Sequence, residues 1–172
     1  MIREIVKGPV PVLTTPAQPF LFGQHDPREL AVDLIDTMVA APGIGLAANQ
    51  IGVPLRAFAF VAFEGNQIVP DAKPKVVFNP EITATSGKMI KLEEGCLSFP
   101  ELICEIERPE YIQVKYQDIM GNFHELTLSG MLGRIWQHEI EHLDGKLFYN
   151  NLSPVTRWFV MKKWRKNVNR KA

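Results

Sequence analysis

Two histidines near the carboxyl end of the chain have the spacing of metal ligands on one helix. His138 and His142 lie four positions apart, so on an α-helix both imidazoles project from the same face, one turn apart. Glu139 directly follows the first histidine and is placed to reach a water bound to the same ion. The competing interpretation is an amphipathic helix whose histidines form hydrogen bonds inside the core. Two imidazoles leave a metal site short of ligands, so the metal hypothesis requires a third ligand elsewhere in the chain.

That third ligand has to come from upstream of the helix. No His, Asp or Glu follows Gly145, and the upstream candidates are Cys96, Cys104, a third histidine or a carboxylate. Cys96 is favoured because Gly95 beside it allows the backbone to approach an ion or a substrate closely. Cys104 lies in an apolar stretch and is expected to pack as a small hydrophobic residue. One thiolate and two imidazoles leave a fourth position open, which is typical of catalytic metal sites.

Three stretches of the chain, in the right order, resemble the signature motifs of the peptide deformylases. They are residues 43–50 (Gly-Ile-Gly-Leu-Ala-Ala-Asn-Gln), 94–98 (Glu-Gly-Cys-Leu-Ser) and 137–145. Residues 79–82 and the N-terminal segment are also similar to the family, so the resemblance covers nearly the whole chain. It implies removal of the formyl group from N-formylmethionine at the start of nascent polypeptides, with release of formate. The helix at the C-terminal end resembles the form common in Gram-negative bacteria.

The resemblance implies a metal centre and a proton-transfer group. Cys96, His138 and His142 match the ligands of one divalent ion, which in the family is Fe(II) in the native state and is replaceable by Zn(II) or Ni(II). Glu139 matches the general base and acid. It would take a proton from the metal-bound water that attacks the formyl carbonyl, and would return it to the departing amine.

The resemblance also implies how the substrate is held. The Gln50 side chain and the Leu97 backbone N–H match the two donors to the formyl oxygen, which oppose the negative charge of the tetrahedral intermediate. Gly45 would pair its backbone with the substrate peptide and extend a strand. Three apolar residues are expected to line the pocket for the methionine side chain, with an ordinary place in the core as the alternative: Ile44, Met131 and Ile135.

Two positions depart from the family pattern. Glu141 stands where the family usually has Asp, so the carboxylate keeps its charge and gains one methylene. It is not a metal ligand, and the departure therefore bears on the geometry around the ligands. Ile103 stands where several members carry an arginine that approaches the substrate backbone, so contacts beyond the methionine are expected to differ here.

The pattern of apolar residues predicts an α+β fold. We expect short antiparallel sheets packed around the central metal-binding helix, with one helix near each end of the chain. The N-terminal residues through Phe22 are expected to be extended. The first helix is expected from Asp26, as its cap, to about Ala41. Further elements are expected as strands over 56–63, 76–83, 88–93, 111–117 and 123–128, a metal-binding helix from Ser129 to Gly145, and a last helix over 155–168.

Composition limits the class of protein. The chain has 172 residues, 46% of them apolar and 22% charged, which suits one globular catalytic domain over residues 1–172. The two cysteines argue against a disulfide framework. The N-terminal residues lack the features of a signal peptide, and the longest apolar run, 57–63, is too short to span a bilayer. We therefore expect a cytoplasmic monomer of a bacterium or phage, with no membrane partner.

The segment after Asn151 is strongly basic. It carries no acidic residue and these seven cations: Arg157, Lys162, Lys163, Arg165, Lys166, Arg170 and Lys171. One interpretation of the predicted C-terminal helix, 153–172, is a solvated face whose charges suit a helix C-terminus. The other is docking to ribosomal RNA, as the resemblance implies for this helix. Trp158 and Trp164 are candidate packing anchors in either case.

Two other functions compete with the deformylase hypothesis. A zinc endopeptidase would share the paired histidines, but it is disfavoured because no third ligand lies downstream and a cysteine ligand is unusual in that class. A ribosome-associated or RNA-binding module would hold the metal for structure only. Formate release from a formylated peptide distinguishes all three.

Overall fold

The fold comes from a computed structural model that describes residues 1–168. Its helices are α1 (Pro11–Thr14), α2 (Pro27–Ala40), α3 (Gly130–Leu143) and α4 (Pro154–Val168), with short 3₁₀ helices η1 (Ala48–Ile51) and η2 (Phe148–Asn151). The strands are β1 (Gly45–Ala47), β2 (Ala57–Phe60), β3 (Phe63–Glu64), β4 (Gln67–Ile68), β5 (Lys75–Thr85), β6 (Met89–Cys96), β7 (Phe99–Pro109), β8 (Tyr111–Gln117) and β9 (Phe123–Ser129).

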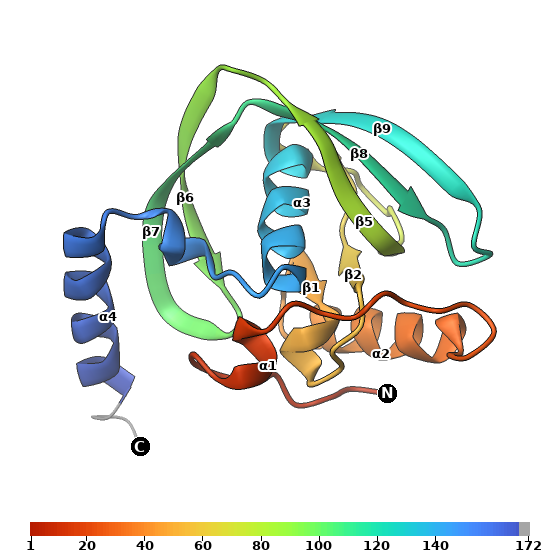
Figure 1. Ribbon diagram of the computed structural model, residues 1–172, viewed down its shortest axis with the longest axis horizontal. Coiled ribbons are helices and arrows are strands. Elements are labelled where there is room, and N and C mark those ends of the chain that lie inside the picture. Colours follow the sequence, from red (N-terminus) through yellow and green to blue (C-terminus); the bar gives the residue numbers. More distant parts are fainter. Residues whose placement is uncertain (169–172) are drawn as a thin grey trace.

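Helix α3 is the centre of the molecule, and two sheets enclose it (Figure 1). A five-stranded antiparallel sheet with the order β1-β2-β5-β8-β9 curves around one side. The two-stranded ribbon of β6 and β7 stands on the other side. Register shifts between β5 and β8, at Phe78/Glu81 and Ile82/Ala84, are the irregularities that let a sheet bend around a helix. The predicted α+β fold with a central helix is confirmed.

The five-stranded sheet holds α3 by an aromatic cluster. Trp136 of α3 is buried, and its ring meets Phe58, Phe60 and Tyr116 at centroid distances of 5.0, 5.3 and 5.2 Å. All three pairs are close to edge-to-face, the arrangement that aromatic quadrupoles favour. Gly133, one turn earlier, lets β9 approach, because a Cβ there would stand 3.1 Å from the Leu128 backbone. This glycine therefore allows β9 to pack closely against α3.

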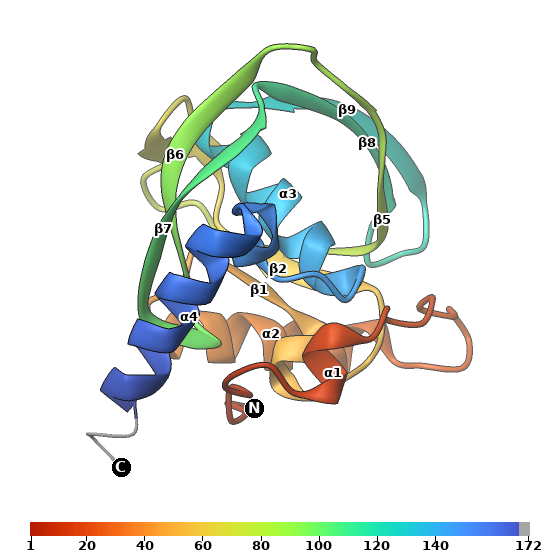
Figure 2. The same ribbon diagram turned by 60° about the vertical axis from the view of Figure 1, so that its left-hand side comes forward.

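Helix α4 packs on the outside of the ribbon, away from the five-stranded sheet (Figure 2). Trp164 anchors it. The indole N–H donates to the Pro100 carbonyl at 2.9 Å, and the ring lies 5.1 Å from Phe99 between centroids. Trp158 is instead exposed, with the Lys162 ammonium 4.6 Å from its ring centroid. Residues 169–172 of the predicted basic helix lie outside the described residues.

Helix α2 starts and ends as its sequence predicts. The Asp26 carboxylate accepts hydrogen bonds from the backbone N–H of Arg28 and Glu29, at 2.8 and 3.4 Å. Leu34 and Met38 are fully buried, and the helix stops before the 42–43 Pro-Gly pair. Helix α2 packs against β1 and β2, close to where the glycine-rich stretch 43–50 begins.

Several predicted boundaries are wrong. The first 22 residues are not wholly extended, because α1 forms with Pro11 at its first position. The strand predicted over 56–63 breaks after Phe60, and the short β3–β4 hairpin follows. Strand β7 was not predicted at all, although Leu102, Cys104 and Ile106 alternate as buried residues along it.

Helix α3 begins without a side-chain cap and with a glycine at its first position. Ser129 occupies the N-cap position of α3, but its side chain makes no capping hydrogen bond. Gly130 follows with a φ of 59°, a conformation that favours glycine.

Within residues 1–168, none of the helices has both the length and the apolar character needed to cross a bilayer.

Candidate active site

Three predicted ligands from distant parts of the chain meet at one point. Cys96 ends β6, and His138 and His142 lie one turn apart on α3. One ligand atom from each residue lies within 4.8 Å of the other two, and the Cys96 Sγ is 3.2 Å from His142 Nε2. The ribbon places the thiol, because the β6–β7 register shifts between Gly95 and Cys96 and the chain turns there.

The donor set fits a divalent transition metal. A thiolate and two imidazoles are the sulfur and nitrogen ligands that Zn(II), Fe(II) and Ni(II) accept, and three protein ligands leave a position for water or substrate. Burial and the nearby His138 lower the pKa of His142 well below its ordinary value, so the ring is held in its neutral, ligating form. This arrangement brings together all three ligands that the sequence predicted.

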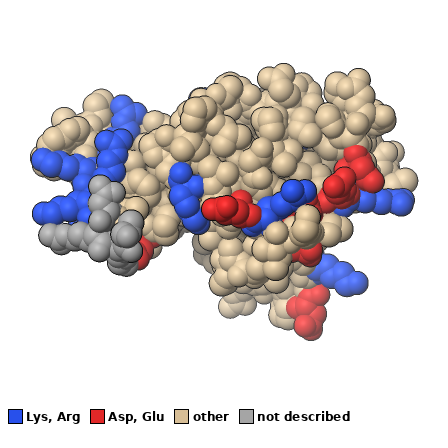
Figure 3. Space-filling model, turned by 90° about the horizontal axis from the view of Figure 1, so that it is seen from below, with Lys and Arg blue, Asp and Glu red and all other residues tan. Residues whose placement is uncertain are grey.

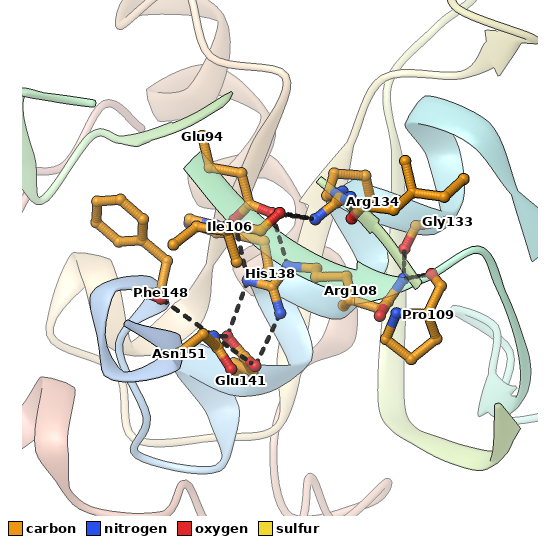
Figure 4. Close-up of polar contacts among 12 residues, drawn as sticks. Glu94, Ile106, Arg108, Pro109, Gly133, Arg134, His138, Glu141, Phe148 and Asn151 are labelled. Atoms are coloured by element: carbon orange, nitrogen blue, oxygen red, sulfur yellow. Dashed lines mark hydrogen bonds and ion pairs between the residues drawn. The ribbon is translucent and has the colours of Figure 1, made fainter. Parts of the chain in front are cut away.

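Glu94 holds the first histidine in place (Figure 4). Its Oε2 lies 2.9 Å from His138 Nδ1, which leaves Nε2 of the ring to face the thiol and an ion. Burial alone would raise the pKa of Glu94, but hydrogen bonds from His138 and Arg108 outweigh it and lower the pKa to about 2. Glu94 is therefore ionised and acts as a fixed acceptor. The pKa of His138 is raised well above its ordinary value, because Cys96 and Glu94 outweigh burial, so protons compete with a metal for this ring.

Two arginines neutralise Glu94. Arg108 of β7 makes a bidentate contact to it, Nε to Oε1 at 2.6 Å and Nη2 to Oε2 at 2.9 Å. Arg134 of α3 donates to Glu94 Oε1 at 3.0 Å and to the carbonyls of Ile90 and Ile106. A buried carboxylate is tolerated only with such pairing, so the ribbon and α3 are tied together by charge.

Glu139 is buried next to the ligands with an unsatisfied oxygen. Its exposed fraction is 4%, and within the described residues its Oε2 has no hydrogen-bond partner. Burial raises the pKa of Glu139 to about 7, against a lowering by the nearby His138. A carboxyl group with such a pKa can both accept and donate a proton near neutral pH. A bound divalent cation would add positive charge nearby and lower this pKa.

Gly45 stands against Glu139, at the start of the short strand β1. A Cβ at Gly45 would collide with Glu139 Oε1 and lie 3.0 Å from Ile135 Cγ2. Only glycine therefore lets β1 pass so close to the carboxylate. Gly43 is equally confined, because a Cβ there would stand 2.8 Å from a methyl group of Leu97. The small residues of the 43–50 stretch are explained by this close approach.

Gln50 points its amide at the thiol. It lies on η1, 2% exposed, and its Oε1 accepts from the Ala47 backbone N–H at 2.8 Å. That contact fixes the amide so that Nε2 is the end near Cys96 Sγ, at 3.5 Å, and Ser98 Oγ, at 3.1 Å. Leu97 lies beside it, with its carbonyl accepting from Lys7 Nζ at 2.6 Å. The predicted oxyanion donor of Gln50 therefore lies next to the candidate metal site, and Leu97 directly follows Cys96 in the chain.

A cavity of about 660 Å³ is lined by Gln50, Cys96, Leu97, His138 and Glu139, among other residues. Its walls include Ile44, Met131 and Ile135, the three residues predicted for the methionine pocket. Ile135 is 4% exposed, Met131 is half-buried and Ile44 is 40% exposed, so the pocket runs from the core to the surface. The cavity is thus apolar on one side and carries the polar cluster on the other, as substrate sites usually are.

Sequence reasoning missed the partners of the ligands. Glu94 lay within a recognised motif but was given no role, and Arg108, Arg134, Lys7 and Ser98 were not singled out. A signal existed for Arg108, because it occupies an inward position in the alternation of β7, where a charged residue requires a buried partner. Cys104 is buried in the ribbon, as predicted. His25 and His124 lie outside the cavity.

Comparisons with known proteins agree on one family. The sequence model of the family described as polypeptide deformylase matches residues 2–158. A peptide deformylase of Rhodopseudomonas palustris (strain BisB18) is 39% identical over 171 residues, which cover 98% of this chain and 96% of that relative. The crystal structure of peptide deformylase from Ehrlichia chaffeensis has a TM-score of 0.88 and 34% identity, over 99% of both chains. A class I type b peptide deformylase from Acinetobacter baumannii, solved with Met-Ala-Ser bound, has a TM-score of 0.80 and 32% identity, over 88% of this chain and 99% of that one.

Proposed function

The chain belongs to the polypeptide deformylase family, and on that premise we propose how its own residues perform the reaction. Like its family, the protein removes the formyl group from the N-terminus of nascent peptides in a metal-dependent hydrolysis. The observation that carries the proposal is the meeting of Cys96, His138 and His142 beside a cavity whose lining includes Cys96, His138 and Glu139, the last with an unsatisfied oxygen.

We infer that Cys96, His138 and His142 hold the ion. Fe(II) is the native metal in this proposal, and Zn(II) or Ni(II) can replace it, because a thiolate with two imidazoles accepts all three. When bound, such an ion supplies a Lewis acid and lowers the pKa of a coordinated water. Glu94 keeps the His138 ring turned toward the ion through its hydrogen bond to Nδ1.

Glu139 moves the proton. Its carboxylate takes a proton from the water that attacks the formyl carbon, and the carboxylic acid then gives that proton to the nitrogen of the departing amine. The C–N bond breaks, and formate and a free methionine amine result. Burial raises the pKa of Glu139 and a bound cation would lower it, and these opposing effects allow the carboxyl group both to accept and to donate a proton.

Gln50 and Leu97 bind the formyl oxygen by hydrogen bonds. The Gln50 Nε2 and the Leu97 backbone N–H donate to it as it gains negative charge. Gln50 is already oriented by its contact with Ala47, so little reorganisation is needed when the charge develops. Its amide exchanges the Ser98 hydroxyl for the substrate oxygen.

The peptide binds along β1. This strand is at the edge of the five-stranded sheet, and in the described part of the chain its outer side has no neighbouring strand. A substrate backbone can therefore pair with Gly45, an interaction that tolerates many sequences. The methionine side chain enters the apolar part of the cavity, between Ile44, Met131 and Ile135. The Met-Ala-Ser bound to the related structure is a peptide of the kind this cleft would hold.

Helix α4 is a second contact surface in this proposal. Lys and Arg side chains gather over the α4 end of the molecule (Figure 3). A groove of about 660 Å³ is lined there by Arg157, Trp158, Lys162 and Arg165. Cations beside an exposed indole suit a ribosomal RNA partner, whose phosphates they would contact. We propose a cytoplasmic monomer that docks to the ribosome through this helix, with an affinity that falls steeply as salt rises.

Formate release from formyl-Met-Ala-Ser tests the function. The wild-type protein is expected to release formate, and the Glu139→Ala variant is expected to lose nearly all of that activity while still folding. Full activity of Glu139→Ala would contradict the assignment of Glu139, and cleavage of an internal peptide bond would indicate an endopeptidase. Anaerobic purification followed by elemental analysis identifies the native metal.

A further inference from the structure

Glu141 is a charged residue of the metal-binding motif that the reaction leaves unused. It lies on α3, one residue before the ligand His142, and its side chain points toward Arg108 (Figure 4). The two groups meet through both oxygens, Nη1 to Oε1 at 2.8 Å and Nη2 to Oε2 at 2.9 Å. Bidentate contacts of this kind fix the orientation of both groups as well as their distance.

Arg108 is therefore held between two carboxylates. Glu94 and Glu141 both contact it, and the guanidinium is 3% exposed. Two acceptors fix the plane of a guanidinium, because its donors form a rigid fork. With Glu141 removed, the guanidinium would keep only Glu94 as a charged partner within the described residues, and it could turn with that carboxylate. Arg134 also holds Glu94, at Oε1, so Glu141 acts on Glu94 mainly at Oε2, which Arg108 Nη2 contacts.

Glu94 connects Arg108 to the proposed metal ligand His138 by hydrogen bonds. Its Oε2 accepts both from Arg108 Nη2, at 2.9 Å, and from His138 Nδ1, at 2.9 Å. A shift of the guanidinium therefore changes the oxygen that orients the His138 ring. The outer partners of metal-bound histidines set both ring orientation and basicity, and their loss commonly costs 10- to 100-fold in metal affinity.

Asn151 of η2 fixes Glu141 from the outer side. Its amide nitrogen lies 3.1 Å from each carboxylate oxygen of Glu141 and 3.1 Å from the Phe148 carbonyl. Phe148 itself stacks near the ligand, with its ring centroid 5.6 Å from that of His138. The longer reach of a glutamate brings its carboxylate within hydrogen-bond distance of both Arg108 and Asn151.

We propose that Glu141 is a positioning residue for the metal centre, acting through Arg108 and Glu94 on the orientation of His138. The proposal rests on the ligand set Cys96, His138 and His142, and it adds a determinant of metal affinity outside that set. Glu141 touches neither substrate nor ion. Its removal is therefore expected to weaken metal binding before it changes peptide binding.

Zn(II) affinity, measured by competition with a chromogenic chelator, tests this proposal. The Glu141→Gln variant keeps the length of the side chain but loses its charge, and it is expected to bind Zn(II) at least about 10-fold more weakly. The KM for formyl-Met-Ala-Ser, measured with saturating metal, is expected to stay within about twofold of wild type. Glu141→Asp restores the charge at shorter reach, so its loss of affinity is expected to be smaller, about threefold, and it serves as the test if Glu141→Gln does not fold.

Glu110→Gln is the matched control. Glu110 also pairs with one cation, Lys88, at 2.8 Å, and it contacts none of the ligands. It should leave Zn(II) affinity unchanged. A Zn(II) affinity of Glu141→Gln equal to that of Glu110→Gln would overturn the proposal, even if Glu141→Gln melts at a lower temperature. These binding measurements do not depend on activity, so a protein that binds Zn(II) through Cys96 but releases no formate would contradict the proposed function alone.

Discussion

The two sides of α3 are held by opposite means. Toward the five-stranded sheet, Trp136 and its neighbours bury apolar and aromatic surface. Toward the ribbon, the helix presents His138 and Arg134, which contact Glu94 of β6, and Glu94 also pairs with Arg108 of β7. Cys96, at the end of β6, joins the cluster. Apart from Glu139, which lies against β1, the sheet side is packed almost without charge, whereas the ribbon side contains buried charges that pair with one another.

The two sides of α3 are expected to tolerate amino-acid substitutions to different degrees. Apolar packing is non-directional, and a buried hydrophobic residue can be exchanged for another of similar volume at small cost. Buried charges lose their hydration and depend on specific partners. The loss of one partner therefore leaves the other charge buried and unpaired, which is strongly destabilising. The sheet side therefore supplies stability, and the ribbon side supplies the geometry that a metal and a proton donor require. Four predictions test this contrast, from the largest expected effect to the smallest.

Glu139→Gln tests whether the carboxylate of Glu139 contributes to catalysis without stabilising the fold. The variant should lose about 10³-fold in kcat/KM for formyl-Met-Ala-Ser, since general acid–base groups contribute roughly 10²- to 10⁴-fold. Its free energy of unfolding should stay equal or rise, because a buried carboxyl with an unsatisfied oxygen is replaced by a neutral amide. Formate assays and urea unfolding measure the two quantities. More than a tenth of wild-type activity would remove Glu139 from the mechanism.

Arg108→Met and Ile140→Leu compare the two sides directly. Arg108→Met leaves Glu94 and Glu141 without their shared cation and should lower the free energy of unfolding by about 3–5 kcal/mol. Ile140 belongs to the apolar cluster on the sheet side, and Ile140→Leu should cost less than about 1.5 kcal/mol. Urea unfolding of both variants gives the comparison. Equal costs would show that the ribbon is no more demanding than the sheet.

Gln50→Ala separates oxyanion stabilisation from metal binding. We expect kcat to fall about 10²- to 10³-fold, as for other single oxyanion donors. Zn(II) affinity should remain close to wild type, since Gln50 lies 3.5 Å from the Cys96 sulfur and is not among the ligands. Kinetics and chelator competition on the same preparation measure both. A fall in metal affinity equal to the fall in kcat would instead make Gln50 part of the metal site.

The ion pair that ties the N-terminus to α2 should matter least. Asp33 accepts from the Met1 amino group and from Arg3 Nε, both at 2.7 Å. Burial raises the pKa of Asp33, but these two partners outweigh it and lower the pKa below its ordinary value of 3.8. Its stabilising effect is therefore complete above pH 3.8 and is lost as the pH falls through the lower, folded-state pKa.

Asp33→Asn measures that contribution. At pH 7 the variant should be less stable than wild type by less than about 1 kcal/mol, because one side of the pair is open to solvent. The difference should shrink as the pH falls below 3.8, since the wild-type carboxylate becomes protonated there. A difference that grows on acidification would contradict the pKa direction.

Local pattern was enough to predict the parts of the site that lie close together in sequence. The spacing of His138 and His142 and the cap of α2 at Asp26 both act over a few residues, and the structure places each as expected. The central helix within an α+β fold also followed from the order of elements. These features depend on backbone periodicity and sterics, which the sequence displays directly.

Long-range pairing was not visible in the same way. The partners of Glu94 are Arg108, Arg134 and His138, separated from it by 14, 40 and 44 residues. Nothing in a single sequence says which buried charges will meet, because that depends on how β6, β7 and α3 pack. Strand β7 was not predicted either. A charged residue, Arg108, occupies one of its inward positions, so the segment does not have the pattern of a buried strand.

Removal of the metal tests the central contrast most directly. The protein is loaded with Zn(II), then stripped with a strong chelator, and followed by formate release and by urea unfolding on the same sample. If the ribbon side holds a catalytic ion while the sheet side holds the fold, activity falls to background, returns on adding Zn(II), and cooperative unfolding persists without metal. Loss of cooperative unfolding on chelation, or activity that survives it, would contradict this account.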